Sequence, residues 1–409
     1  MRSRLATLAL VSATLLLAGC TASPPPAPET PSASAAPDVP AEAIDDSFTP
    51  LVAQVLSEPR GVPSTDGRVH VAYELHLSNM TSQSATIQRI DVRDQNDDSV
   101  ETLDGDEIDS WVRILGASSP GRTVGPGQGA LVWLDVVVDS MDELPTTLSH
   151  DVTFDFSPGA PPIIPEQMTE RLAVTPVDPA PAVVIGPPLK GAGWFNGNSC
   201  CTVTPHRAAI NPINGSLYAP ERYAIDYVRL DSSGSFLDGP NDELSSYPYF
   251  GSEIIAVGDG PIVSMRFDLP EQKPGADPTG LTLDEYGGNH IVQSLGNGVY
   301  AFYAHLQTGN PTGVEVGQQL KKGETISLLG NTGNTDSPHL HFHLMDSPSP
   351  LGSNGIPFVI ESFDLTGTVP ADELATRIAA GGPFTLDSAD AGERTDQYPL
   401  WLTVSDYPE

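Results

Sequence analysis

Residues 338–344 read P-H-L-H-F-H-L, with a histidine at every second position. Side chains alternate between the two faces of a β-strand, so His339, His341 and His343 are expected on one face and the apolar residues between them on the other. Such a face is either a metal site or an unusual polar surface. Because paired imidazoles bordered by glycine turns have no obvious packing purpose, the pattern favours a metal site.

The composition of the whole chain points to a β-rich, acidic protein. The 409 residues include 40 prolines and 38 glycines, which is typical of many turns rather than long helices. The 53 acidic residues against 19 basic ones give a net charge of −34. This charge disfavours nucleic acid or an anionic membrane surface as a partner.

The N-terminus has the pattern of an export signal. Arg2 and Arg4 precede an apolar run that ends in Leu17-Ala-Gly-Cys20. The last four residues resemble the bacterial lipobox, which implies that Cys20 is lipidated and that the mature chain is exported and anchored to a membrane through this lipid. An ordinary signal peptide cleaved nearby is the alternative.

Changes in composition divide the chain into six parts. Alternating runs such as 70–77 and 130–136 predict an antiparallel β-sandwich, and similar runs at 253–257 and 299–306 predict further strands. The predicted parts are a signal peptide (1–20), a disordered Pro/Ala/Ser linker (21–45), a β-sandwich accessory domain (46–157), a Pro-rich linker (158–189), a second β-rich domain (190–365) and a C-terminal extension (366–409).

Three short motifs stand in order in the second domain: Tyr303-Ala-His305-Leu306, a glycine ladder from Val316-Gly317 to Gly330-Asn-Thr-Gly333, and His339-Leu-His341-Phe342. Together they resemble the lysostaphin-type, or LytM-like, zinc endopeptidases that cut peptidoglycan cross-links. The resemblance implies an antiparallel, β-rich metallopeptidase domain of the barrel-sandwich type. Together with the β-sandwich-like domain that the alternating runs predict before it, the chain is expected to be mainly β. It also implies Zn²⁺ as cofactor.

The resemblance assigns roles to individual residues. It implies that His341 is a zinc ligand, that His305 and His339 are the catalytic pair, and that Asp226, in Ala224-Ile-Asp-Tyr227, is the carboxylate ligand. Three protein ligands leave zinc one open position, where a bound water becomes a usable nucleophile. A nearby histidine can take the proton of this water, and a second can stabilise the developing oxyanion.

The family's remaining ligand is a histidine four residues before the aspartate, where this chain has Arg222. Arginine has no free acceptor atom for a metal. The nearest upstream candidate is His206, separated from Asp226 by a segment with a hairpin-turn signal at Asn214-Gly215. A two-residue turn there would bring residue 206 opposite residue 223. We therefore expect an inserted hairpin that keeps His206 as ligand, and a site lacking its third ligand is the alternative.

Other residues have weaker signals. Tyr303 is expected on the same face as His305, so it could bind substrate, with packing as the alternative. His343 shares a face with His341 and is a candidate to support this ligand. Cys200 and Cys201 are adjacent, and in an oxidising compartment they could form a disulfide with each other, pair between molecules or act as soft metal ligands.

The sequence thus predicts a zinc endopeptidase that hydrolyses peptide cross-links of peptidoglycan, on an exported, membrane-anchored lipoprotein. Its expected partners are peptidoglycan and the membrane, with a second wall hydrolase as a further candidate and no nucleic acid. A different class of function stays open, because some members of the family have lost zinc ligands. Such a degenerate domain would bind the wall or activate another wall hydrolase.

Overall fold

The computed structural model describes residues 47–374 and 382–409 of the chain. The predicted signal peptide, the lipidation site Cys20 and the predicted linker at 21–45 lie outside the described residues. The described elements belong to one compact unit, Phe48–Glu409. They are mainly antiparallel β-strands, as predicted from the composition and the alternating runs.

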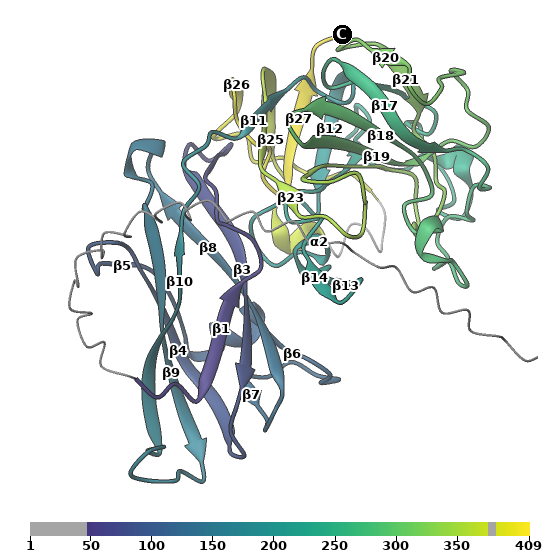
Figure 1. Ribbon diagram of the computed structural model, residues 1–409. Coiled ribbons are helices and arrows are strands. Elements are labelled where there is room, and N and C mark those ends of the chain that lie inside the picture. The colour runs from purple at the N-terminus through teal and green to yellow at the C-terminus, as the bar shows by residue number, and fades with distance from the viewer. Residues whose placement is uncertain (1–46, 375–381) are drawn as a thin grey trace, which may run out of the picture. The chain divides into compact units, whose positions relative to one another are not determined.

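Two sheets form a β-sandwich in the first part of this unit (Figure 1). The first has the order β1 (Leu51–Val55), β3 (Val69–Asn79), β8 (Gly129–Val138) and β6 (Val112–Ile114), with β2 (Val62–Pro63) beside β3. The second has the order β10 (Gln167–Pro176), β9 (Thr147–Ser157), β4 (Ser84–Arg93) and β5 (Ser99–Asp104), with β7 (Thr123–Val124) beside β4. Their facing side chains form one hydrophobic core, as the period-two alternation requires.

A larger sheet, with eleven strands among the described residues, forms the second part. Its order is β20 (Gln319–Leu320), β17 (Gly260–Arg266), β18 (Asn289–Gly296), β19 (Val299–Leu306), β22 (Leu340–Met345), β15 (Ile225–Arg229), β12 (Gly191–Gly197), β27 (Thr403–Tyr407), β25 (Phe363–Thr368) and β26 (Gly392–Arg394), with β23 (Gly355–Ile356) beside β22. Strands β15, β19 and β22 are adjacent, and they carry the histidine and aspartate motifs.

Small elements complete the described structure. The paired strands are β11 (Val183–Ile185) with β24 (Phe358–Ile360), β13 (Asn211–Ile213) with β14 (Ser216–Tyr218), and β16 (Glu253–Ile255) with β21 (Thr325–Leu328). The short helices are α1 (Ile108–Trp111), α2 (Pro205–Ala208), η1 (Gly105–Glu107), η2 (Met141–Glu143), η3 (Leu244–Ser246) and η4 (Leu283–Glu285). Within the described ranges, no helix is long and apolar enough to cross a membrane.

Two of the predicted boundaries differ from the structure. The stretch 158–189, expected to be a linker, contributes β10 to the sandwich and β11 to a pair with β24. The many prolines around these two strands are typical of a linker, and for this reason the stretch was not predicted to pair. The stretch 366–409, expected to be an extension, places β27 between β12 and β25 in the large sheet. The C-terminal residues are therefore part of the second domain's sheet.

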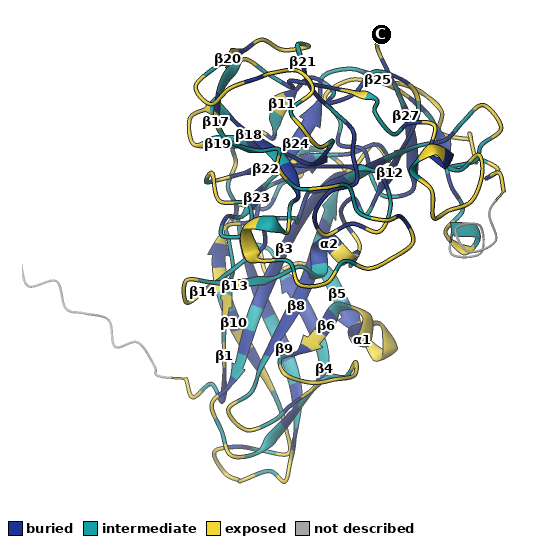
Figure 2. Ribbon diagram, turned by 90° about the vertical axis from the view of Figure 1, so that its right-hand side faces the viewer, coloured by how far each residue is buried: buried dark blue, intermediate teal, exposed yellow. Residues whose placement is uncertain are grey.

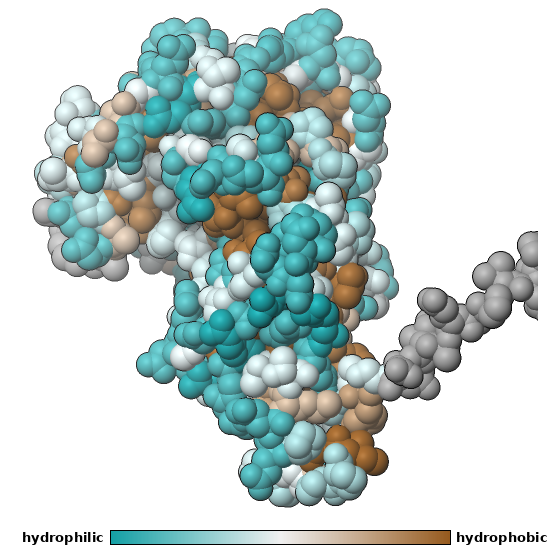
Figure 3. Space-filling view, turned by 90° about the vertical axis from the view of Figure 1, so that its left-hand side faces the viewer, coloured by the Kyte–Doolittle hydropathy of each residue, from teal (hydrophilic) through white to brown (hydrophobic). Residues whose placement is uncertain are grey.

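Strand β3 is buried on both faces, which Figure 2 shows in dark blue along much of its length. Val71, Tyr73 and Leu75 point into the sandwich core, whereas Ala72 packs with the core of the large sheet. The polar Glu74 is also fully buried on this second face. The molecular face in Figure 3 is mostly hydrophilic, in keeping with the excess of acidic residues.

Candidate active site

The alternation predicted for residues 338–344 is present in β22. Leu340, Phe342 and Leu344 are in the core of the large sheet, and His341 and His343 are on the opposite face. Asp226 on β15 is the direct cross-strand partner of His341. Directly opposed residues of an antiparallel pair share a face, so the two side chains meet, with 3.0 Å between His341 Nδ1 and Asp226 Oδ1.

His206 reaches the same aspartate from α2. Thr204 caps this helix by accepting a hydrogen bond from the amide of Arg207, and Pro205 occupies its first turn. His206 Nε2 lies 3.1 Å from Asp226 Oδ2. Its Nδ1 donates to the main-chain oxygen of Ala224 at 3.1 Å. The sequence-predicted proximity of His206 to Asp226 is present.

The predicted hairpin is also present, but its strand pairing begins at Asn211 and does not include His206. Strands β13 and β14 pair around Asn214 and Gly215, both with positive φ, as a type I′ turn requires. The extrapolated pairing of residue 206 with residue 223 does not form, because residues 205–208 turn into α2. Arg222 points away from the site and forms an ion pair with Glu74.

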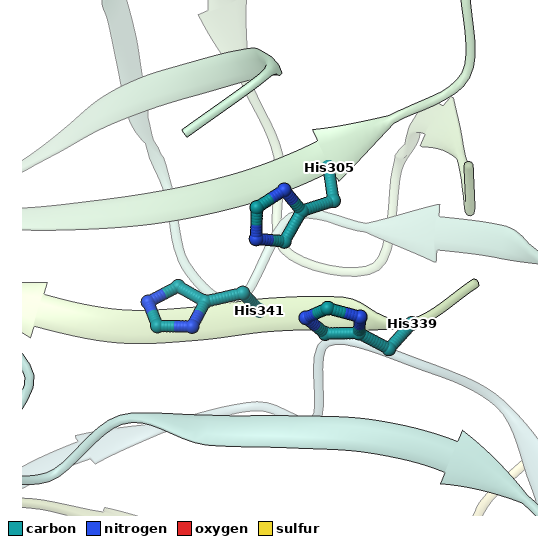
Figure 4. A group of neighbouring side chains, drawn as sticks. All are labelled: His305, His339 and His341. Carbon is teal, nitrogen blue, oxygen red and sulfur yellow. The ribbon is translucent and has the colours of Figure 1, made fainter. Parts of the chain in front are cut away.

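His305 and His339 lie beside these three residues. Figure 4 shows the rings of His305, His339 and His341 facing a common space, with His305 coming from the strand above. The ring centres of His305 and His339 are 4.6 Å apart. His339 Nε2 is 3.3 Å from Asp226 Oδ1. A positive φ of 58° at His305 breaks the alternation of β19 at this residue.

Main-chain carbonyls fix the orientation of three of the rings. His305 Nδ1 is 2.7 Å from the oxygen of Thr332, and His339 Nδ1 is 2.9 Å from the oxygen of Ser337. A carbonyl oxygen can only accept, so Nδ1 carries a hydrogen in both rings, as it does in His206. The Nε2 atom of each ring is therefore left for a metal or a substrate.

The pKa values of the site residues are shifted because several histidines are buried around a single carboxylate, that of Asp226. Burial alone would raise the pKa of Asp226, but the charges of His206 and His339 outweigh it and hold this pKa well below its usual range. Burial would lower the pKa of His206, yet Asp226 raises it to about 9. For His305, burial and the neighbouring His339 and His341 all lower the pKa. Asp226 is therefore a carboxylate, as metal ligation requires.

The donor atoms form two overlapping groups that can hold a metal ion. His206, Asp226 and His341 form one, His305, His339 and His341 the other, and within each group the atoms lie within 4.8 Å of one another. The first group pairs two imidazoles with a carboxylate, a donor set that zinc accepts in catalytic sites. Its three donors come from α2, β15 and β22, so only the tertiary structure completes it.

Two cavities meet at this group. One of about 550 Å³ is lined by all five of these histidine and aspartate residues. The other, of about 370 Å³, is lined in part by the aromatic residues Phe195, Tyr247 and Trp401, and it shares Asp226 and His339 with the first. An extended ligand can therefore approach the group from two sides.

The remaining predicted residues are placed as follows. His343 Nδ1 is 2.9 Å from His341 Nε2, a position from which it can support this ligand. The prediction that Tyr303 binds substrate is wrong, and the alternative, a packing role, holds. The side chain has no exposed surface, and its hydroxyl donates to Gln293 and accepts from the amide of Val257. The bulge between β18 and β19 and the positive φ of His305 separate its face from that of His305. Cys200 and Cys201 form a disulfide.

Asn198 is a site residue that sequence reasoning missed. Its side-chain nitrogen donates to Asp226 Oδ2 at 2.8 Å and so orients the carboxylate. It lies in a loop after β12, and no pattern in Asn196-Gly-Asn-Ser distinguishes it from an ordinary turn residue.

Part of the chain is similar to a known peptidase family. The model of peptidase family M23 matches residues 247–352. The chain contains a peptidase family M23 domain. The matched residues include His305, His339 and His341 of the M23 domain, whereas His206 and Asp226 precede the match and are assigned by their geometry.

Two relatives of the M23 domain illustrate its similarity to known proteins. Peptidoglycan DD-endopeptidase ShyA of Vibrio cholerae is 29% identical over 126 residues, 31% of this chain and 27% of ShyA. Cell division protein DipM of Caulobacter vibrioides is 36% identical over 109 residues, 27% of this chain and 15% of DipM. The chain therefore spans only about a quarter or less of the length of these relatives. The catalytic domain of lysostaphin from Staphylococcus simulans aligns at 21% identity with a TM-score of 0.22, over 41% of this chain and 88% of that domain.

Proposed function

We propose that this chain is a zinc-dependent endopeptidase that hydrolyses peptide cross-links of bacterial peptidoglycan. The observation that carries the proposal is the convergence of His206, Asp226 and His341 beside a second pair of histidines, His305 and His339. The M23 match and the names of the relatives support the substrate class.

The residues fit a zinc ion. His206 would offer Nε2, Asp226 a carboxylate oxygen, and His341 Nδ1, and each histidine has its other ring nitrogen on a protein atom. Zinc bound by these residues supplies Lewis-acid activation of a water nucleophile.

The other residues of the site handle protons and charge. His305 and His339 are each held at Nδ1 by a carbonyl, so their Nε2 atoms face the space where the scissile peptide would lie. One Nε2 accepts the proton of the attacking water and returns it to the leaving amine, and the other, when its ring is protonated to the imidazolium, donates to the oxyanion. The two cavities provide room for the peptide on either side of the scissile bond.

The test compares metal content and activity of the full chain, of His341→Ala and of His206→Ala, with His76→Ala in the sandwich as control. Wild type and control should bind near-stoichiometric zinc and release peptides from purified peptidoglycan, identified by mass spectrometry. Both ligand variants should lose zinc and activity. A wild-type chain that binds no zinc would refute the enzyme and favour a degenerate, binding domain. Retention of zinc by His206→Ala would refute only this ligand.

The export signal supports a location outside the cytoplasm. In this proposal the chain is a lipoprotein anchored to a membrane through Cys20, near its peptidoglycan substrate. Replacing Cys20 by Ser should release the chain from the membrane fraction. Mass spectrometry of the mature N-terminus should find the lipid on Cys20 in the unaltered chain, and an unmodified cysteine there would contradict the proposal.

A further inference from the structure

Helix α2, which carries His206, makes several hydrogen bonds to the β-sandwich. The four-residue helix is too short to be stable by itself, so its position depends on contacts outside it. The indole nitrogen of Trp133 on β8 donates to the main-chain oxygen of Arg207 at 2.6 Å. The guanidinium of Arg113 on β6 donates to the oxygen of Ala208 at 3.0 Å. Two carbonyls at the end of α2 therefore accept from the sandwich.

The side chain of Arg207, next to His206, makes further contacts with the sandwich. It is 1% exposed. Its guanidinium donates to the main-chain oxygens of Tyr73 on β3 and Leu134 on β8, each at 3.2 Å. It also donates to the oxygen of Cys201 at 2.6 Å, which ties the disulfide loop to the same group. Arg207, the residue next to the candidate ligand His206, thus connects α2 to two strands of the sandwich.

The carboxylate of Glu74 balances the buried positive charge of Arg207. This carboxylate is fully buried on β3, where it lies 3.3 Å from Arg207 Nε and accepts hydrogen bonds from Arg222. Arg222 stands where the resemblance implies a histidine ligand, but its guanidinium pairs with Glu74 of the sandwich. In the proposed function His206 on α2 takes the place of that ligand, and Arg222 helps to hold the sandwich against the second domain.

We infer that the β-sandwich is the positioning element for the metal ligand His206, and that Trp133 and Arg207 are positioning residues for metal binding. This inference rests on the proposed function. The reason is geometric: a ligand must be held within a few tenths of an ångström of its bonding distance, and the contacts that orient it set the affinity of the site. Asp226 and His341 are fixed by the pairing of β15 with β22, whereas His206 lies on α2, outside these strands, and only its ring is oriented from there, by the main-chain oxygen of Ala224.

The test uses the full chain with Trp133→Phe, which removes the indole donor and keeps an aromatic ring. Trp111→Phe, in α1 on the sandwich core, is the matched control. Zinc affinity, measured by competition with a chromophoric chelator, should fall about 10- to 100-fold in Trp133→Phe and stay unchanged in Trp111→Phe. The visible absorption of the cobalt-loaded chain should weaken in Trp133→Phe, because His206 would no longer be held in place as a ligand and solvent would replace it. A general loss of packing would not give this difference.

A second measurement separates positioning from other effects. In a His206→Ala background, the weak residual zinc affinity, measured at raised zinc concentration, should not fall further on Trp133→Phe, because the ligand through which Trp133 acts is gone. If Trp133→Phe does not fold, Arg113→Met removes a contact to α2 from the surface and should weaken zinc binding in the same direction.

The inference is overturned if folded Trp133→Phe or Arg113→Met binds zinc within twofold of wild type, or if the loss persists without His206. The proposed function fails separately, if the unaltered chain binds no zinc at all.

Discussion

The histidines of the candidate site differ in the hydrogen-bond partner of the ring nitrogen that faces away from the site. His206, His305 and His339 each donate from Nδ1 to a main-chain oxygen, and His341 instead contacts the side chain of His343 through Nε2. A carbonyl partner fixes one tautomer, so the identity of the partner decides which ring atom faces the site. This difference separates the three histidines that present Nε2 to the site from His341, which presents Nδ1.

Replacing His305 or His339 by Ala should leave zinc binding intact and lower kcat about 10²- to 10⁴-fold, since these rings handle protons rather than the metal. Zinc content and the rate of peptide release, measured on the same preparation, check this. Loss of zinc from His339→Ala would instead show that the second group of donors, which includes His305 and His341, holds the ion.

His343 should matter for zinc affinity through His341. If His341 binds zinc through Nδ1, its Nε2 carries the proton and donates to His343 Nδ1. His343→Leu removes this acceptor and should weaken zinc binding about 10- to 100-fold, whereas His343→Gln, which keeps an acceptor, should retain most of it. Equal affinities for the two variants would show that the contact has no role in ligation. Isothermal titration of zinc into the metal-free chains provides the measurement.

At the scale of elements, glycines allow the loops around His305 to approach each other closely. Gly288 precedes β18 with a φ of +64°, and a Cβ on it would lie 2.1 Å from the main-chain oxygen of Thr332. This oxygen is the acceptor for His305 Nδ1. Space at Gly288 therefore sets the position of a catalytic candidate on another strand.

Gly288→Ala should displace Thr332 and His305, and a displacement of about 1 Å can cost about 100-fold in catalytic rate. Zinc binding should change less, because His206, Asp226 and His341 do not contact this loop in the structure. Gly296→Ala is the control: its φ of +87° gives similar backbone strain, but nothing lies within 4 Å of the added Cβ. Similar activity losses in both variants would assign the effect to strain alone. The measurement is kcat/KM on a peptidoglycan-derived peptide.

At the scale of the whole molecule, buried histidines of the sandwich link stability to pH. Burial lowers the pKa of His150 to about 4, and the ring accepts a hydrogen bond from the hydroxyl of Tyr73. Between pH 6.5 and 4 the unfolded chain binds a proton here that the native chain does not, so the free energy of unfolding falls as the pH is lowered. The full effect is about 3 kcal/mol, and His150→Gln should remove it. Denaturant unfolding at pH 7 and pH 4.5 provides the measurement; an unchanged pH dependence in the variant would contradict it.

His70 should have the opposite effect. Burial would lower its pKa, but hydrogen bonds with Asp135 and Asp66 raise it to about 9. The native chain therefore keeps a proton that the unfolded chain loses, and this stabilisation is present below pH 6.5 and lost as the pH rises through 9. His70→Gln should lower the free energy of unfolding more at pH 6.5 than at pH 9.5. Equal losses at the two pH values would show that the ion pairs do not depend on the charge of His70.

Local patterns predicted the parts of this molecule that depend on neighbouring residues. The alternation of 338–344 gave a strand with Phe342 in a core and His341 on the opposite face, and Asn214-Gly215 gave a hairpin turn. The same reasoning failed at Tyr303, because a bulge and one residue with positive φ break the alternation between Tyr303 and His305. It also failed at 158–189, where prolines stand close to both ends of β10 and β11.

The sequence by itself determined that this chain is mainly β, that its histidine-rich strand has a polar face, and which motifs resemble a peptidase. The tertiary structure decided how the candidate metal site is completed. Asp226 meets His341 through strand pairing, but His206 reaches them on a four-residue helix that the sandwich holds in place through Arg207 and Trp133. Such contacts join residues far apart in the chain, so the periodicity of neighbouring residues does not predict them. For this reason the sequence named His206 only as a nearby candidate, and gave no sign that Arg222 would bind Glu74.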